Sequence, residues 1–371
     1  MIQDKDFIKS LIKNKISFFT GVPDSLFKSL CWHLDAKYKG SNFITANEGS
    51  SVGIGIGYNL STKKIPLVYL QNSGLGNTIN PILSMADKKV YGIPLFLLIG
   101  WRGEMLKKKQ VSDEPQHKKQ GEITENLLKV LGIKYKVLGP NSNFKKYIKE
   151  LSNYSIKNSK PVALLVRKNV FTSKKIHNLK DNKFLKREDA LKIVLESIPF
   201  SSIKVSTTGM LSRELNEINF KKKTSKYTFM CVGSMGHAIS IASGIAIKRK
   251  KKKIYCLDGD GSFLMHLGSS TTSAKLNNLI HIVFNNKSHD SVGGHKTSAP
   301  NLRLSNIAKS LGYKNAFTLQ SKEKIKKILN KYIKKNQSLF LEIICSRGSR
   351  SNLTRPKGKL INFKKKFIDI I

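Results

Sequence analysis

The stretch IYCLDGDGSFLMHLGSS (residues 254–270), followed by LIHIVFNNKSHDS (residues 279–291), decides the fold of this chain. In the first stretch, an apolar run typical of a buried strand leads into the glycine-rich turn 259–262 and then into a helix. In the second, another apolar run ends in Asn285-Asn286. Strands that are apolar on both faces and separated by helices are typical of parallel sheets in α/β layers.

Polar residues directly follow both strands. Asp260 and Asn286 stand at the ends of neighbouring strands, where both can reach one hard cation, and carboxylate, amide and phosphate oxygens suit Mg²⁺. Glycines let the backbone come close to a ligand, and a helix N-terminus offers free N–H groups to a phosphate. An ordinary Asp-Gly turn would explain Gly-Asp-Gly alone. The Asn-Asn pair, separated from Gly261 by 23 residues, favours ligand binding.

The same alternation of strand and helix patterns extends over the whole chain. The expected strands are 17–21, 42–45, 66–71, 95–100, 134–139, 162–166, 203–208, 254–259, 279–286 and 339–345, and amphipathic stretches at 24–38, 48–60, 143–158 and 322–335 predict helices. The lysine-rich segment 168–187 has no periodic apolar stripe. We therefore predict two α/β domains, 1–170 and 187–371, each a mainly parallel sheet flanked by helices, joined by a linker at 171–186.

Composition agrees with a folded protein. The chain has 371 residues, 40% of them apolar, which is enough for one large or two ordinary cores and excludes disorder. No apolar run reaches the roughly 18–20 residues that cross a bilayer, and the start MIQDKDF is unlike a signal peptide. We expect a cytoplasmic protein without a membrane partner. The four cysteines are widely spaced and in apolar surroundings, which predicts buried thiols; they are Cys31, Cys231, Cys256 and Cys345.

The formal charge of +43 results from 67 Lys and Arg against 24 Asp and Glu. Lysines gather in short clusters at 107–110, 248–253 and 362–367, without interleaved aromatic residues or a basic recognition helix. This indicates a compositional bias and no nucleic-acid partner. A field of this sign still draws anionic small molecules toward a cleft.

The pair Gly-Asp-Gly and Asn-Asn resembles the cofactor-anchoring motif of thiamin-diphosphate enzymes, with a spacer at the short end of the family range. The resemblance implies thiamin diphosphate and Mg²⁺ as cofactors. It makes Asp260, the side chain of Asn286 and the backbone carbonyl of Ser288 metal ligands, and it places Gly259, Gly261 and Ser262 at the cofactor.

Two further segments match this resemblance. Glu48 follows a strand and opens a small-residue helix, where these enzymes place the carboxyl that hydrogen-bonds N1′ of the aminopyrimidine; a favourable interaction with the helix dipole is the alternative explanation. In VGSMGHAISIASGIAI (residues 232–247) the resemblance makes Gly233 an acceptor for the 4′-amino group, with Ser234 beside it, and Met235 the prop of the bent cofactor. A plain core role is the alternative for Met235.

Longer segments resemble phosphonopyruvate decarboxylases, which convert 3-phosphonopyruvate to phosphonoacetaldehyde and CO₂ in phosphonate biosynthesis. These segments are GVPDSLFKSLC (21–31), VYLQNSGLGNTINP (68–81), LLIGWRGE (97–104), DEPQHKKQGEIT (113–124), HDSVGGHKT (289–297) and RGSRSNLTRP (347–356). Three departures flank the expected site: the long insert 105–112, Lys287-Ser288 where Gly-Ala is commoner, and His295-Lys296 in place of Gln-Pro.

The substrate of such an enzyme carries a phosphonate dianion. Arg102 is the first candidate to bind it, because a guanidinium can grip two oxygens at once, and Lys118, Arg350 and Arg355 are the other candidates. His117 is the candidate for proton handling. A solvated surface side chain is the alternative for each of these five.

Other functions remain open from the sequence. Sulfopyruvate decarboxylase uses the same chemistry on a sulfonate, and a carboligating enzyme of the acetolactate type is a further alternative. A binding-only or nucleic-acid protein has no use for Asp260, Asn286 and Glu48 together. Since Glu48 and Asp260 fall in separate predicted domains, we expect a homo-oligomer, at least a dimer, with active sites between chains.

Overall fold

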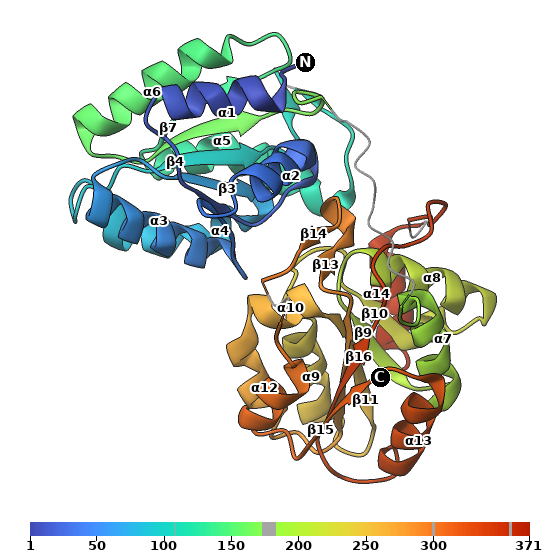
Figure 1. Cartoon of the computed structure of the whole chain (residues 1–371). Helices are drawn as coiled ribbons and strands as arrows, with labels where there is room; N and C mark the ends of the chain where they lie inside the picture. Colours follow the sequence, from blue (N-terminus) through green and yellow to red (C-terminus); the bar gives the residue numbers. More distant parts are fainter. Residues whose placement is uncertain (108, 173–182, 299–300, 356–357) are drawn as a thin grey trace. The chain divides into compact units, whose positions relative to one another are not determined.

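The computed structural model describes residues 1–107, 109–172, 183–298, 301–355 and 358–371. The chain divides into two compact units, residues 1–177 and 178–371 (Figure 1). Most of the predicted linker, residues 173–182, lies outside the described residues. Phe171 is buried in the core of the first unit, and Lys186 forms a β-bridge with Ser346 of the second, so both described ends of the predicted linker belong to the units.

The first unit is built on one parallel six-stranded sheet. Its strand order is β2-β1-β3-β4-β8-β7. The strands are β1 (Phe19–Gly21), β2 (Asn42–Ile44), β3 (Leu67–Gln71), β4 (Phe96–Gly100), β7 (Lys134–Leu138) and β8 (Val162–Val166). The helices are α1 (Asp4–Lys13), α2 (Lys28–Lys37), α3 (Glu48–Thr62), α4 (Leu75–Pro81), α5 (Pro115–Val130) and α6 (Phe144–Asn158).

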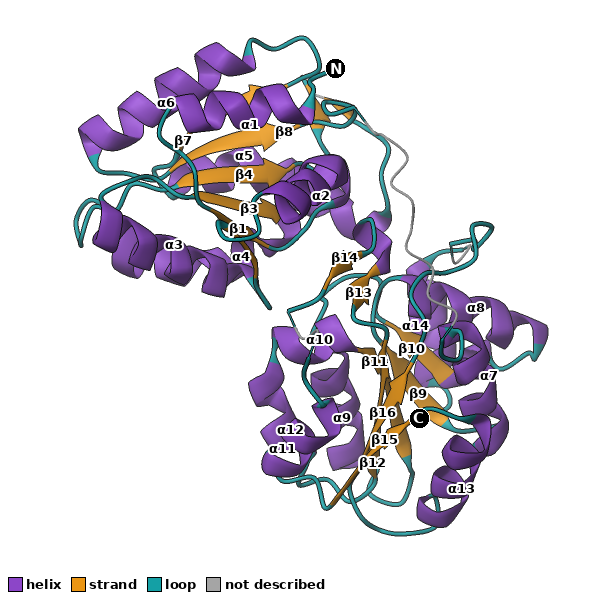
Figure 2. Ribbon diagram, viewed as in Figure 1, coloured by secondary structure: helices purple, strands orange, loops and turns teal. Residues whose placement is uncertain are grey.

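Helices cover both faces of this sheet (Figure 2). Alternate residues of each strand point to opposite faces. Leu67 and Tyr69 of β3 therefore join a core with α1, α2 and α6, while Val68 and Leu70 join a second core with α3, α4 and α5. This double burial is the reason the strands are apolar throughout.

The second unit repeats the plan with the order β10-β9-β11-β12-β16-β15, again all parallel. The strands are β9 (Ile203–Ser206), β10 (Thr228–Met230), β11 (Ile254–Gly259), β12 (Leu279–Asn285), β15 (Asn315–Leu319) and β16 (Leu339–Ile344). The helices are α7 (Arg187–Ser197), α8 (Met210–Lys221), α9 (Ala238–Lys248), α10 (Asp260–Met265), α11 (Ser270–Ser273), α12 (Leu304–Ser310), α13 (Lys322–Tyr332) and α14 (Leu360–Ile368). Helices α7, α8 and α13 pack on one face of the sheet, and α9, α12 and α14 on the other.

Numbered along the chain within each unit, the six main strands follow the same order, 2-1-3-4-6-5, in both sheets. The chain reverses its direction of travel across the sheet between the first and third of these strands. Open α/β sheets bind ligands outside the carboxyl ends of the strands at such a switch point. The structure confirms the predicted α/β class with two mainly parallel sheets.

Two other expectations meet the structure directly. All four cysteines are buried and free of disulfides, as predicted. Among the described residues, no helix has the length and apolar content that crossing a lipid bilayer requires.

Candidate active site

Asp260 and Asn286 lie at the same edge of the second sheet. Asp260 begins α10 directly after β11, Asn286 follows β12, and the two strands pair in register up to Gly259 and Phe284. The Asp260 side chain is buried and accepts a hydrogen bond from Thr297 Oγ1 at 2.7 Å. Burial raises the pKa of Asp260 to about 6. A buried carboxylate whose pKa stays raised despite its hydrogen bonds is the kind of group that a cation stabilises.

The two asparagines after β12 have different tasks. Asn285 donates from Nδ2 to the buried Glu342 at 2.7 Å, which ties the strand end to β16. Asn286 donates from Nδ2 to Asp290 Oδ2 at 2.8 Å, and its Oδ1 accepts from the Ser288 backbone N–H at 3.1 Å. One asparagine therefore anchors the sheet, and the other presents an oxygen at its edge.

This donor set fits Mg²⁺. Asp260 and Asn286 supply oxygens only, and the buried Ser288 Oγ has no hydrogen-bond partner among the described residues. Lys287, between Asn286 and Ser288, has φ of 56°, a left-handed conformation that glycine adopts more readily. That conformation explains why Gly is the commoner residue in the family that the sequence resembles.

The loop from 233 to 236 reaches this edge through Ser262. The Ser262 hydroxyl accepts from the Gly236 N–H at 3.0 Å and from Thr207 Oγ1 at 2.9 Å, so it joins the turn after β11 to the loop before α9. Ser234 has φ of 52° and is exposed, while Gly233 and Met235 are half-buried. Met235 belongs to no core cluster of the described residues, which disfavours the plain core role.

Gly261 shows why the turn after β11 needs glycine. A Cβ at this position would lie 2.6 Å from His289 Cε1, so any side chain would displace the ring of His289, the neighbour of Ser288. A Cβ at Gly259 would meet no atom within 4 Å, so the opposite side of the turn is open. The structure thus brings Asp260, Asn286, Ser288, Ser262 and the 233–236 loop together.

In the first unit, Glu48 is buried at the start of α3. Its Oε2 accepts a hydrogen bond from Asn77 Nδ2 at 2.7 Å. A Cβ on Gly74 would lie 2.3 Å from Glu48 Oε1, so the carboxyl group packs against a backbone that only glycine permits. These contacts hold the Glu48 carboxyl group in one position. A favourable interaction with the helix dipole alone would not require them.

Arg102 follows β4 and is engaged by Asp113. Its Nε donates to Asp113 Oδ2 at 2.8 Å, and Nη1 lies 3.3 Å from Ser25 Oγ. The Arg102 guanidinium lowers the pKa of Asp113 below its usual range. The Asn72 side chain fixes the Arg102 backbone with two hydrogen bonds, at 2.9 and 3.1 Å. Arg102 therefore anchors the 113–117 loop, the short segment that leads into α5 and includes its first residues.

His117 and Lys118 lie in the first turn of α5. His117 is half-buried and Lys118 is exposed. The start of α5 lies close to the backbone of Gly103, which has φ of 67°. A Cβ at Gly103 would lie 2.2 Å from the His117 carbonyl oxygen, so only glycine permits this approach. The insert 105–112 folds into a two-stranded hairpin, β5 (Met105–Leu106) and β6 (Lys109–Gln110), with residue 108 outside the described part.

The basic tail is held by the second unit. Arg350 Nε donates to Glu188 Oε2 at 3.0 Å, and its Nη2 pairs with Glu217. Thr354 adds two hydrogen bonds of 2.8 Å to Glu217. Arg355 is exposed. Arg350 is thus paired with carboxylates of α7 and α8.

Three side chains at these sites have no role in the sequence analysis: Asn77, Thr297 and Asp290. Asn77 and Thr297 lie inside quoted segments, yet no local pattern tells which buried carboxyl they contact. Asp24, fully buried after β1 and hydrogen-bonded to Gln71 at the end of β3, was also missed. Burial raises the pKa of Asp24. A polar residue shortly after a predicted strand is a signal that was available for Asp24 and Asp290 only.

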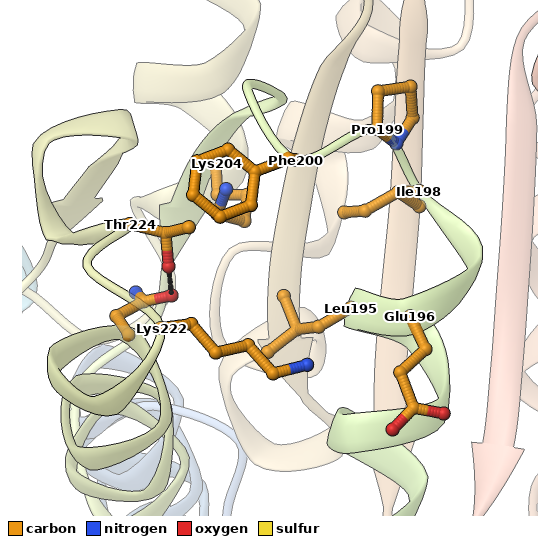
Figure 3. A pocket seen from close by; sticks show the side chains of 9 residues that line it. Leu195, Glu196, Ile198, Pro199, Phe200, Lys204, Lys222 and Thr224 are labelled. Carbon is orange, nitrogen blue, oxygen red and sulfur yellow. Dashed lines mark hydrogen bonds between the residues drawn. The ribbon is translucent and has the colours of Figure 1, made fainter.

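A separate pocket of about 220 Å³ lies at the opposite end of the second sheet (Figure 3). Lys204, at the start of β9, lines it together with Phe200 and Lys222. The Lys204 ammonium group donates to the Ser202 carbonyl at 2.7 Å, and burial lowers its pKa to about 8. None of the site residues predicted from the sequence lines this pocket.

One buried group of metal-binding residue types occurs in the described chain, Cys256, Asp258 and His281. Both His281 ring nitrogens already have partners, Tyr313 Oη at 3.1 Å and Asp258 Oδ2 at 3.3 Å. The group is therefore satisfied as a hydrogen-bond network of the core.

Both units of the chain match known protein families. Residues 3–155 match the family model "Thiamine pyrophosphate enzyme, N-terminal TPP binding domain", and residues 207–343 match "Thiamine pyrophosphate enzyme, C-terminal TPP binding domain". Phosphonopyruvate decarboxylase of Streptomyces viridochromogenes is 26% identical over 96% of this chain and 92% of its own length. Sulfopyruvate decarboxylase of Methanosarcina acetivorans is 27% identical over 81% of each chain. The sulfopyruvate decarboxylase subunit beta of Methanocaldococcus jannaschii is 37% identical over 38% of this chain and 74% of its own.

Proposed function

Because the chain belongs to the thiamin-diphosphate-dependent decarboxylase family, we propose that it converts 3-phosphonopyruvate to phosphonoacetaldehyde and CO₂, with Mg²⁺ as the metal, in phosphonate biosynthesis. The observation that carries the proposal is the pair of oxygen donors, Asp260 and Asn286, at the carboxyl edge of the second sheet. Similarity to a phosphonopyruvate decarboxylase over nearly the full length supports the choice of substrate.

In this proposal the second unit binds the cofactor through its metal. Asp260, the Oδ1 of Asn286 and the carbonyl of Ser288 would hold Mg²⁺, and Gly259, Gly261 and Ser262 would bind the diphosphate. Gly233, Ser234 and Met235 would contact the aminopyrimidine part of the cofactor. When bound, the cofactor supplies the carbon nucleophile for the keto group and the electron sink for the pair released with CO₂.

Glu48 is the residue that would hydrogen-bond the ring nitrogen N1′ of the pyrimidine. The Asn77 amide donates to Oε2, so Oε1, which packs against Gly74, is the oxygen that would bind N1′. Removal of Glu48 should therefore affect turnover more than cofactor affinity.

The phosphonate requires cationic partners. Lys118 and Arg355 are exposed cations, and His117, half-buried in the same turn as Lys118, is the candidate proton donor. Arg102 binds the phosphonate only by sharing its guanidinium with Asp113, and Arg350 only by leaving Glu188 and Glu217. A loop anchor is the structural alternative for Arg102.

Sulfopyruvate is the second candidate substrate, because sulfopyruvate decarboxylases match this chain at similar identity. The two substrates differ in charge: near neutral pH the phosphonate is a dianion and the sulfonate a monoanion. A site lined by several of these cations would favour the dianion.

We further propose that the protein is a homo-oligomer, at least a dimer, in which Glu48 of one chain and Asp260 of another complete each site. The support is that the two residues belong to separate units of the chain. A small molecule is then the only substrate partner that the proposal requires.

The substrate test compares kcat/KM for phosphonopyruvate, sulfopyruvate and pyruvate under identical conditions, with thiamin diphosphate and Mg²⁺ present. The proposal predicts the highest value for phosphonopyruvate, with phosphonoacetaldehyde as product. A higher value for sulfopyruvate would replace the first candidate by the second.

A further inference from the structure

A buried ion-pair network lies behind Asn286. Arg187, the first residue of α7, donates from Nε and Nη2 to the two carboxylate oxygens of Glu214, both at 2.9 Å. Its Nη1 donates to Asp290 Oδ2 at 2.7 Å. The exposed fractions of the three side chains are 7%, 1% and 7%, so solvent does not screen the network. Interactions of this kind fix geometry far more strongly than surface pairs do.

Asp290 connects this network to the side-chain amide of Asn286. The same oxygen that Arg187 contacts, Asp290 Oδ2, accepts the hydrogen bond from Asn286 Nδ2 at 2.8 Å. An ionised carboxylate only accepts hydrogen bonds, so the NH₂ side of the Asn286 amide must face it. The carbonyl oxygen Oδ1 then points to the other side, where the metal is proposed. A flipped amide would present two donors to the cation.

Charge provides the reason for the arginine. Asp290 interacts electrostatically with Asp260 and also with Glu214. Arg187 pairs with two of these three carboxylates, Glu214 and Asp290, so the three acids together carry more charge than the one guanidinium, which leaves an excess of negative charge for a divalent cation to balance. Arg187 keeps Asp290 turned toward the amide, so that it orients the ligand Asn286 and does not compete for the metal.

We propose that Arg187 and Asp290 are positioning residues for the metal site, which fix the Asn286 amide so that its oxygen faces the cation. This inference rests on the proposed function, because it takes Asn286 as a metal ligand. Residues that orient metal ligands typically change metal affinity by about tenfold to a hundredfold when they are replaced.

The test uses Asp290→Asn. An asparagine at 290 either donates or accepts, so both orientations of the Asn286 amide become comparable, while Arg187 keeps its pair with Glu214. Calorimetry at saturating thiamin diphosphate should show a Kd for Mg²⁺ that is about tenfold to a hundredfold higher than in the wild type. The matched control is Asp189→Asn, the same chemical change at a half-exposed carboxylate that pairs with Lys192 at 3.2 Å. It should leave the Kd for Mg²⁺ within twofold.

A second variant addresses Arg187 itself. Arg187→Met leaves two buried carboxylates without a counter-ion and is prone to misfold, so the double variant Arg187→Met/Glu214→Leu removes the charge pair as a unit. Asp290 then keeps one buried charge without its counter-ion, so the unfolding temperature should fall by less than in Arg187→Met, while Mg²⁺ binds as weakly as in Asp290→Asn. Equal metal affinity in this variant and in Asp290→Asn, at different unfolding temperatures, separates positioning from a purely structural role.

The outcomes also separate this inference from the function beneath it. Wild-type affinity for Mg²⁺ in Asp290→Asn, together with lost affinity in Asp260→Ala, would overturn the positioning role alone. Absence of any Mg²⁺-dependent binding of thiamin diphosphate by the wild type would overturn both.

Discussion

Arg102 and Asp113 form a two-point ion pair at the carboxyl end of β4, with the Nε to Oδ2 contact at 2.8 Å. The pair connects the turn after the strand to the loop that leads into α5. The residue predicted to bind the phosphonate is therefore also the residue that positions the loop before α5, the helix that carries His117. These two roles make different predictions for the same substitution.

Arg102→Ala tests them with two substrates. If the guanidinium contacts the phosphonate, the variant loses about 1.5–3 kcal/mol of transition-state stabilisation, or roughly tenfold to a hundredfold in kcat/KM, with phosphonopyruvate only. We expect this selective loss, with the slow reaction of pyruvate nearly unchanged. Equal losses with both substrates would identify Arg102 as the anchor of the 113–117 loop, and Arg350 and Arg355 would be the next residues to replace.

Asp260 and Glu48 should fail in different ways. Asp260→Ala is expected to abolish activation by Mg²⁺ and to weaken thiamin diphosphate binding sharply, because it removes a metal ligand. Glu48→Gln is expected to bind the cofactor with a Kd near that of the wild type and to turn over poorly. Calorimetry of both variants decides the point, and equal loss of cofactor binding would refute the division of roles.

The effect of Asp260 on protein stability provides a control for the Asp260→Ala experiment. Its pKa in the folded protein, about 6, lies above the ordinary value of 3.8, so between these values the folded state binds more protons than the unfolded state. Stability of the unloaded protein therefore falls as pH rises through this range. At pH 7 the carboxylate destabilises the fold, and lost binding in Asp260→Ala should not come with a lower unfolding temperature.

Lys204 predicts the opposite dependence on pH. Its pKa of about 8 in the folded protein lies below the ordinary 10.5, so the unfolded state binds more protons between these values, and stability rises with pH there. Lys204→Met should stabilise the protein at pH 7 by about 1–3 kcal/mol, and the gain should shrink toward pH 10.5. Thermal unfolding followed by circular dichroism at pH 7 and pH 10 measures it, with the exposed Lys222→Met as control. A gain that does not change with pH would show that Lys204 remains charged when buried.

Subunit exchange tests the location of the active site. Glu48→Ala and Asp260→Ala are each expected to be inactive, and mixed oligomers should regain part of the activity because some sites receive both intact halves. Recovery requires that exchange is shown independently, for example by mass spectrometry of differently tagged chains. Exchange without recovery would place both halves of the site in one chain.

The sequence predicts the parts of the fold that repeat a local pattern. All ten expected strands occur, because runs such as 96–100 and 162–166 are buried on both faces and therefore apolar throughout. Two strands of the main sheets escaped prediction, β10 and β15. Both lie at sheet edges, where β10 has only three residues and four of the five residues of β15 are partly exposed, so neither carries a continuous apolar run.

The residues of the candidate site likewise divide into those that a local sequence pattern marks and those that it does not. Asp260 and Asn286, directly after strands, and Glu48, at the start of a helix, could be proposed as site residues because each stands in a recognisable motif. The network of Arg187 was not, since its partners lie 27 and 103 residues away and meet only when α7, α8 and the end of β12 pack together. The ion pairs of Arg102 and Arg350 were missed for the same reason, because a sequence shows the charges of a region and not which of them neutralise one another.

The most direct test of the central claim is the release of labelled CO₂ from phosphonopyruvate carrying ¹³C in its carboxyl group. The purified protein is supplied with thiamin diphosphate and Mg²⁺, and ¹³CO₂ and phosphonoacetaldehyde are followed together by NMR. The account predicts equal amounts of the two products, complete loss of both when Mg²⁺ is chelated, recovery when it is restored, and no product from Asp260→Ala. Product formation that persists without Mg²⁺ and in Asp260→Ala, or no product from the fully supplied wild type with any of the three 2-oxo acids, would contradict it.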